Sequence, residues 1–283
     1  MTSLMNRTVW ASAACAAMTF GVASADVISF QNGLNGYVGT EDVSLVTNPS
    51  GTGTVNTGAW DAFPINTQDT RPGLIRFQDI FGNGSNQVPL DATINSVTLR
   101  LFQFARDGAT TIRAYPMLTD WTEGNSSPGG AFAVAQAGES TLQARHYRPD
   151  QDYAANPGDA WGTDGQAHTG PVRKDLAGLG NGWDWASDDT RLATASNSNT
   201  NGVWIEWDLT ALAQDWQDGS QTNYGVFMNT QNTLATSFRS SEYADDPSLR
   251  PMLVADFTLI PEPGSVSVIG AMGWLLLMRR NGR

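Results

Sequence analysis

The chain has 283 residues, a formal net charge of −12 and a single cysteine, Cys15. The acidic balance argues against nucleic acid as a partner, because phosphate backbones are bound by clustered Lys and Arg. Only 16% of the residues are charged and 29 are glycine, a composition typical of a turn-rich all-β protein.

Residues 1–25 have the three parts of a secretory signal peptide. Arg7 supplies the positive charge, the apolar stretch TVWASAACAAMTFGV follows, and the small residues Ala23 and Ala25 mark a cleavage position before Asp26. We therefore predict export through the secretion machinery. Since Cys15 leaves with this segment, the exported protein has no disulfide and no thiol nucleophile.

Short runs of alternating apolar and polar residues follow, separated by Gly, Asn, Asp and Pro. In INSVTLRLFQF, Val97, Leu99 and Leu101 fall on one face of a strand and Arg100 on the other. VWIEWDL repeats this alternation. These runs predict an antiparallel β-sandwich or barrel over residues 26–258. The other predicted strands are DVISF, EDVSLV, LIRFQDI, TTIRAYPML, NYGVFMN, TSFRS and PMLVADFTLI.

One short helix is predicted after Asp208, because Leu209, Leu212, Ala213 and Trp216 recur at helical spacing. Large indole rings with apolar neighbours are usually buried. The predicted core tryptophans are Trp121, Trp207 and Trp216.

The segment 131–201 lacks this alternation and is rich in Gly, Asp and aromatic residues. A loop this long in a compact domain is usually functional. Its aromatic rings would stack on sugar rings while neighbouring polar groups bind the hydroxyls. The alternative is that these rings fasten the loop to the sandwich. The candidate carbohydrate-binding residues are Tyr147, Tyr153, Trp161, Trp183 and Trp185.

Carboxylates in the same segment predict a structural calcium ion, which binds six to eight oxygen ligands. The candidate ligands are Asp184, Asp188 and Asp189, although they lack the spacing of an EF-hand. The alternative for such a cluster is a solvated acidic loop. No other cofactor is predicted.

No catalytic motif is present, and we name no catalytic residue. The chain has no nucleophile elbow, phosphate-binding loop or zinc-site spacing, and its two histidines are His146 and His168. Loop carboxylates such as Asp150 and Asp152 leave a glycosidase or lyase open, because glycoside hydrolysis uses two carboxylates about 5 to 9.5 Å apart.

Residues 259–283 contain a Pro-Glu-Pro triplet, an apolar stretch and a pair of arginines. Val266 to Met278 is shorter than the roughly 20 residues that a membrane-spanning helix needs. This tail resembles the PEP-CTERM sorting signal of bacteria. The resemblance implies transient membrane association, recognition by an exosortase-type processing enzyme and transfer to the cell surface. The residues that carry it are Pro261, Glu262, Pro263, Arg279 and Arg280.

The order of several pieces resembles the DNRLRE, or disaggregatase-related, domain family. The pieces are LIRFQDIFGNGSNQVPLDATINSVTLRLFQF, DWTE, DAWGTDG, WIEWDLTALAQDWQDGSQTNYGVFM and SFRSSEYADDPSLRPMLVADF, and they extend over nearly all of residues 26–258. The resemblance implies a jelly-roll-like antiparallel β-sandwich that serves as a carbohydrate-binding or surface module. It supplies no catalytic residue.

These observations predict an exported protein of the cell surface, outer envelope or extracellular matrix that binds polysaccharide without cleaving it. One alternative is a structural surface protein whose sandwich binds other proteins. The other is a glycosidase or lyase that uses loop carboxylates.

Overall fold

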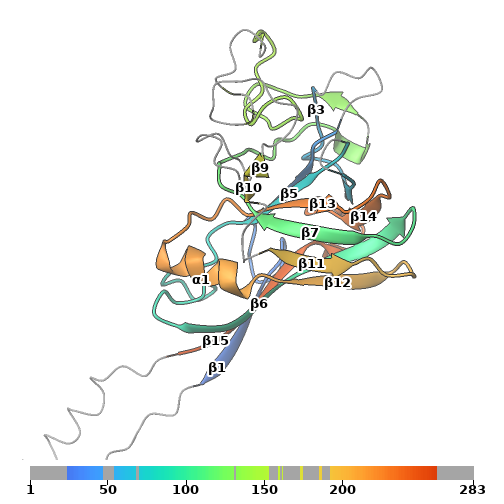
Figure 1. Ribbon diagram of the computed structural model, residues 1–283. Coiled ribbons are helices and arrows are strands. Elements are labelled where there is room, and N and C mark those ends of the chain that lie inside the picture. Colours follow the sequence, from blue (N-terminus) through green and yellow to red (C-terminus); the bar gives the residue numbers. More distant parts are fainter. Residues whose placement is uncertain are drawn as a thin grey trace, which may run out of the picture.

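The computed structural model describes residues 24–46, 54–67, 70–130, 132–152, 159, 161, 173–174, 185–186 and 192–259. Two antiparallel sheets form most of this part (Figure 1). Sheet A consists of β1 (Ala25–Phe30), β15 (Met252–Thr258), β6 (Thr93–Arg106), β14 (Thr236–Arg239) and β4 (Ala62–Ile65), and β12 (Val203–Asp208) pairs with β6. Sheet B consists of β11 (Ala193–Ser196), β7 (Thr111–Pro116), β13 (Val226–Thr230), β5 (Gly73–Phe77) and β2 (Thr40–Ser44).

All nine predicted strands are present, and the prediction of an antiparallel all-β protein is confirmed. The alternation expected in the long strand β6 is also confirmed, because Val97, Leu99 and Leu101 are buried while Arg100 and Phe102 are half-buried. Two strands within the sheets, β4 and β11, were not predicted. Short elements outside the two sheets were not predicted either. They are β3 (Val55–Asn56), which pairs with β8 (Ala133–Val134), β9 (Arg173–Lys174), which pairs with β10 (Trp185–Ala186), and the 3-10 turns Pro128–Gly130 and Pro247–Leu249.

The main hydrophobic core lies between the two sheets. Sheet A contributes Leu99, Leu101 and Trp207, and sheet B contributes Ile75 and Met228. Trp207 is fully buried, as predicted. Its Nε1 donates a hydrogen bond of 3.1 Å to the carbonyl oxygen of Ile112 in β7, so this side chain joins the sheets directly.

Sheet B is covered on both faces. Leu74 and Phe227 neighbour core residues in sequence but point the opposite way, into a second cluster with Trp121, Leu142 and Trp161. Figure 1 shows the segments that follow β7 and β8 lying beyond sheet B. This double burial explains why every residue of β5 and β13 is buried rather than every second one.

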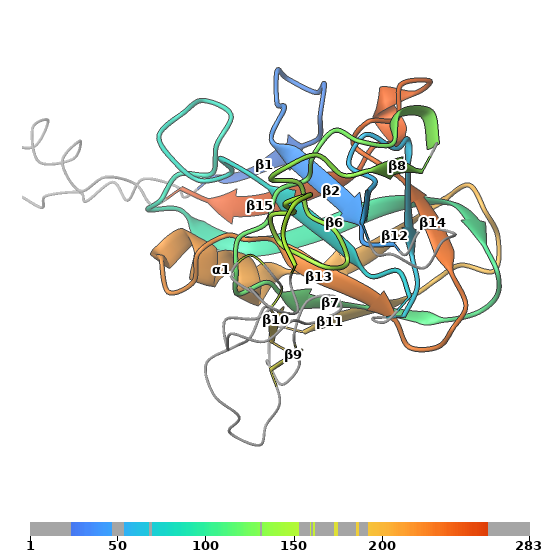
Figure 2. The ribbon, with the colours of Figure 1, turned by 90° about the horizontal axis from the view of Figure 1, so that it is seen from above.

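The predicted helix is α1 (Thr210–Asp218), which packs against β6 (Figure 2). Leu212 and Ala213 are buried, and Trp216 is partly buried against the main core. The helix ends at Gly219, whose φ of 78° is the left-handed conformation that glycine adopts most easily. No helix in the described part of the chain is long and apolar enough to cross a membrane.

Strands β1 and β15 lie side by side, with Ala25 opposite Thr258 (Figures 1 and 2). The described chain therefore enters and leaves sheet A at the same place. The predicted signal peptide, apart from Ser24 and Ala25, and the predicted sorting residues Pro261, Glu262, Pro263, Arg279 and Arg280 lie outside the described residues.

Candidate functional site

Two of the predicted carbohydrate-binding residues are buried. Trp161 has no exposed surface, and its Nε1 donates a hydrogen bond of 2.8 Å to the carbonyl oxygen of Thr141. Tyr147 is 7% exposed and packs with Ala135 and Ala144. A buried ring offers no face to a sugar, so the prediction of a sugar platform at Trp161 and Tyr147 is wrong. The alternative, that the ring fastens its loop to the sandwich, holds for Trp161.

Trp185 is the one other predicted sugar-binding residue in the described part of the chain. The backbone of Trp185 forms part of β10. The residues that lie outside the described part of the chain are Tyr153, Trp183, Asp184, Asp188, Asp189 and Ala23. Their predicted roles in sugar binding, calcium binding and signal cleavage stay predictions.

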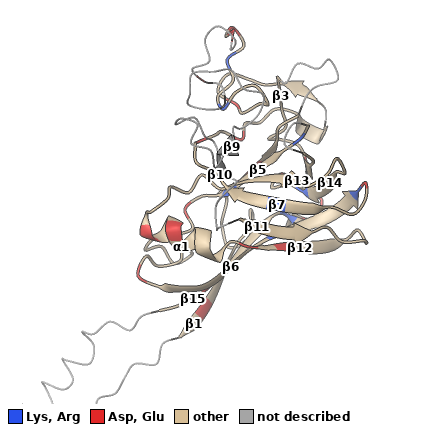
Figure 3. Ribbon diagram, viewed as in Figure 1, with Lys and Arg blue, Asp and Glu red and all other residues tan. Residues whose placement is uncertain are grey.

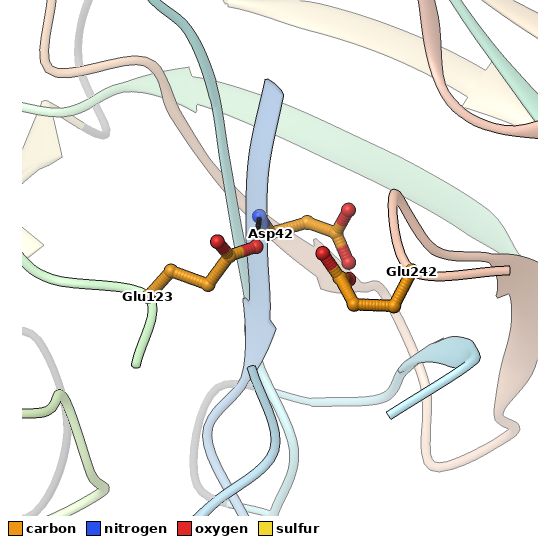
Figure 4. A group of neighbouring side chains, drawn as sticks. All are labelled: Asp42, Glu123 and Glu242. Atoms are coloured by element: carbon orange, nitrogen blue, oxygen red, sulfur yellow. Dashed lines mark hydrogen bonds between the residues drawn. The ribbon is translucent and has the colours of Figure 1, made fainter. Parts of the chain in front are cut away.

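The structure brings together three acidic residues that the sequence analysis did not single out. Asp42 lies on β2, Glu123 follows β7, and Glu242 follows β14. One carboxylate oxygen from each lies within 4.8 Å of the others. Figure 4 shows Glu123 and Glu242 approaching Asp42 from two sides. In the part of the chain that the structure describes, this is the one acidic group whose oxygens are this close.

Asp42 lies at the margin of the main core. It pairs with Ile75, a residue of that core, while its neighbour Val43 pairs with Leu74 of the second cluster. Because successive residues of a strand face opposite sides, the Asp42 side chain points between the two sheets. Only 2% of Asp42 is exposed to solvent.

Ser241 lies at the centre of the hydrogen bonds in the cluster. Its amide donates to Asp42 Oδ2 over 2.7 Å, and its hydroxyl donates to Glu242 Oε1 over 2.8 Å. The amide of Asp42 donates to Glu123 Oε1 over 2.6 Å. Glu242 Oε2 is buried without a hydrogen-bond partner. Amide and hydroxyl hydrogens of Asp42 and Ser241 thus point into the cluster.

No side-chain cation of the described residues pairs with these carboxylates. Among the described residues, none of the three carboxylates forms an ion pair. Arg76 on β5 is already bound by other acids, because its Nε donates to Glu41 over 2.9 Å and its Nη1 donates to Asp120 over 2.6 Å. Glu41 is on the opposite face of β2 from Asp42, so the two acidic sets share one strand.

Burial and mutual repulsion favour the neutral form of the cluster. Burial raises the pKa of Asp42 to about 7. Burial, followed by the charge of Asp42, raises the pKa of Glu242 to about 8. Burial, followed by the charges of Glu242 and Asp42, raises the pKa of Glu123 to about 10. Like charges this close cannot all form away from water, so the three groups titrate as one coupled set.

The cluster can be neutralised in two ways, by bound protons or by a cation. Calcium requires six to eight oxygen ligands, and the cluster offers three carboxylates. The amide hydrogens of Asp42 and Ser241 already point at the carboxylate oxygens, and a cation at the same place would repel them. These hydrogen bonds lower the pKa values of Asp42 and Glu123, but burial raises the same pKa values by more, so the cluster favours bound protons.

A second feature is the outer face of sheet A, which we call the aromatic face. It is formed by half-buried or exposed side chains on the side of the sheet away from the core. Phe102 packs edge-on against Trp204 with ring centroids 5.5 Å apart, and the Arg100 guanidinium lies 5.2 Å from the Trp204 ring. The aromatic face consists of Arg100, Phe102, Phe104, Trp204, Glu206 and Arg239.

Arg239 is held flat on this face. Its guanidinium carbon lies 4.1 Å from the centroid of Phe104 and 3.9 Å from that of Tyr243. Stacking between two rings fixes a long side chain that would otherwise be mobile. In the described part of the chain Arg239 forms no ion pair.

An open cleft lies near the acidic cluster, lined among others by Thr122, Gln136, Glu139, His146 and Arg148. Among the described residues, Glu139 is the one carboxylate in its lining. The two oxygens of Glu139 accept hydrogen bonds from the amides of Asn125 and Gln136 and from the hydroxyl of Ser126. A pair of carboxylates for glycoside hydrolysis is therefore not found among the residues that line this cleft.

Comparison with known proteins adds no assignment. No protein-family model matches the chain, and no curated protein matches it.

Proposed function

We propose that this protein is exported to the cell surface, outer envelope or extracellular matrix of a bacterium and binds polysaccharide there without cleaving it. The aromatic face is the observation that carries this proposal. The predicted signal peptide, the predicted sorting tail and the resemblance to the jelly-roll-like DNRLRE domain support it independently. An exosortase-type enzyme is the expected processing partner.

The aromatic face has the chemistry that a sugar chain requires. Phe102, Phe104 and Trp204 offer half-exposed rings, and indole and phenyl rings stack on the C–H faces of pyranoses. Arg100 and Arg239 lie beside these rings and can donate hydrogen bonds to sugar oxygens. The face is part of a continuous sheet, which suits an extended chain better than a small molecule.

The start of β1 and the end of β15 are placed so that the predicted signal peptide and the predicted sorting tail can both be cleaved without loss of a strand. Cleavage after Ala25 removes only the first residue of β1 and leaves Asp26 paired with Phe257. Because β15 ends beside it at Thr258, both processing sites are expected at one end of the domain. Attachment there leaves the aromatic face accessible along its length.

Replacing Trp204 by Ala tests the proposal. We expect about tenfold weaker retention by the recognised polysaccharide, the equivalent of about 1.4 kcal/mol, because one stacking ring is lost. Affinity electrophoresis against neutral and anionic polysaccharides, with calcium and again with EDTA, measures this change. Phe132→Ala is the matched control, because Phe132 is 46% exposed and lies outside the aromatic face.

The same experiment separates the alternatives. A wild-type protein that no polysaccharide retards, or a Trp204→Ala protein retarded as strongly as wild type, contradicts binding at the aromatic face and favours a structural surface protein. Release of reducing ends or unsaturated sugars on prolonged incubation favours the glycosidase or lyase. Loss of retention in EDTA supports the predicted calcium ion.

A further inference from the structure

We propose that Asp42, Glu123 and Glu242 share protons and form an acid-dependent clasp, which joins β2 to the segments after β7 and β14 and opens as the pH rises above neutrality. The clasp is defined by these three carboxyl groups together with Ser241. The proposal does not rest on polysaccharide binding, because none of these residues belongs to the aromatic face.

The clasp connects parts of the chain that are distant in sequence. Glu123 is 81 residues from Asp42, to whose amide it is hydrogen-bonded, and Ser241 is 199 residues from Asp42. When protonated, a carboxyl group becomes a hydrogen-bond donor that a second carboxylate can accept. A partly protonated cluster is therefore held together by hydrogen bonds between its carboxyl groups. In the fully ionised cluster the three negative charges repel one another.

The charged groups around the clasp do not relieve this repulsion. On the opposite face of β2, Glu41 adds negative charge that acts on Glu123. Arg76 from β5 is bound by Glu41 and Asp120. Glu139 already accepts hydrogen bonds from the amides of Asn125 and Gln136. Arg239 from β14 is stacked between Phe104 and Tyr243. Among the described residues, Arg76 thus already has acidic partners and Arg239 has two rings, and we infer that bound protons supply the neutrality of the clasp.

The dependence of stability on pH follows from this arrangement, with a sign opposite to that of most acidic residues. Below the ordinary carboxyl pKa of about 4, the folded and unfolded chains both hold these protons, and the contribution to stability is complete. As the pH rises, the unfolded chain releases them first. The contribution is lost as the pH passes the folded pKa values, about 7 for Asp42 and about 8 for Glu242.

We expect opening of the clasp to change the shape of the cleft that is lined by Thr122 and Glu139. Thr122 and Gly124, the neighbours of Glu123, line that cleft. The carbonyl oxygens of Glu123 and Gly124 also lie against Gly58, where an added Cβ would be only 2.4 Å and 2.5 Å away. Since this backbone is packed so closely, ionisation cannot be accommodated by a small shift and must displace the segment.

Thermal unfolding of the full-length protein between pH 6 and pH 9 tests the clasp. We expect the Tm of the wild type to fall by roughly 5 °C over this range. The Tm of Glu123→Gln should fall much less. The Gln side chain keeps an oxygen that accepts from the backbone amide of Asp42, but it cannot ionise. Asp91→Asn is the matched control and should follow the wild type, since Asp91 is exposed. Few other side chains titrate in this window, because the chain has only two histidines.

Three results would overturn the proposal. One is a wild-type Tm that stays constant or rises from pH 6 to pH 9. Another is a Glu123→Gln protein whose Tm falls in parallel with the wild type. The third is a Tm that calcium raises in the wild type but not in Glu123→Gln, because a cation rather than protons would then occupy the cluster.

A second measurement keeps the test decisive if Glu123→Gln does not fold. Carbon-13 NMR of the side-chain carboxyl groups in the wild type follows each titration directly. We expect at least one carboxyl to titrate above pH 6.5, and its signal to be absent or shifted in Glu242→Gln. A spectrum in which every Asp and Glu titrates below pH 6 contradicts the clasp.

Discussion

We expect Trp207→Ala to lower the free energy of unfolding by about 3 to 5 kcal/mol, the usual cost of truncating a buried aromatic ring. Trp207 has no exposed surface, and its ring packs edge-on against Phe238 at 5.8 Å. Truncation also leaves the Ile112 carbonyl without the indole donor that links sheet A to sheet B. Since single domains are stable by only about 5 to 15 kcal/mol, this variant should be close to unfolding.

Urea denaturation of Trp207→Ala and Trp204→Ala measures this difference directly. The two residues are the same type on the same strand, but Trp204 lies on the aromatic face. Trp204→Ala should therefore lose only about 1 kcal/mol, from its contact with Phe102. Equal losses in the two variants would contradict the assignment of the two faces. The pair also separates stability from binding, because Trp204→Ala is the variant expected to lose polysaccharide.

The strands could be predicted because their signal is local. Alternation with a period of two identifies β6 and β12, and helical spacing identifies α1, from adjacent residues alone. The second cluster was not visible in this way. Both faces of β5 and β13 are buried, so the alternation disappears, and the loop that covers them has no periodicity. Trp161 accordingly resembled an exposed loop residue although it fills a site over sheet B.

The clasp could be predicted only in part. Asp42 gives a weak signal, because it is an acid within the predicted strand EDVSLV and Asp is uncommon in strands. Glu123 and Glu242 give none, because each lies in a polar turn where acids are usual. Their approach to Asp42 is set by the registers that place β2 at the edge of sheet B and β14 within sheet A. Such registers are not encoded in any short stretch of sequence.

Removal of Arg76 should have the second-largest effect on stability. We expect Arg76→Met to lower the free energy of unfolding by about 3 kcal/mol, because breaking a buried ion pair leaves a desolvated charge behind. The side chain of Arg76 is 10% exposed and that of Glu41 is 26% exposed. The side chain of Asp120 is 55% exposed and can be solvated by water. The expected loss of stability is therefore at the lower end of the range for broken buried ion pairs.

Arg100→Met is the matched control for this substitution. Its ion pair with Glu206 has side chains that are 32% and 55% exposed, so its loss should cost no more than about 1 kcal/mol. The double variant Arg76→Met/Glu41→Gln should recover part of the stability, because the orphaned charge is gone. No recovery would mean that Arg76 acts through its contact with Trp121, whose ring lies 5.0 Å away, rather than through charge.

The pH dependence of Arg76→Met connects this network to the clasp. Glu41 already raises the pKa of Glu123 through its charge, as the weakest of the causes after burial, Glu242 and Asp42. Without Arg76, the full charge of Glu41 acts on Glu123 across β2. A higher folded pKa of Glu123 extends the pH range over which stability is lost, so the Tm of Arg76→Met should keep falling to a higher pH than that of the wild type when the scan is carried above pH 9, and Glu41→Gln should cancel the difference. Parallel pH profiles would show that the acids on the two faces of β2 are electrostatically independent.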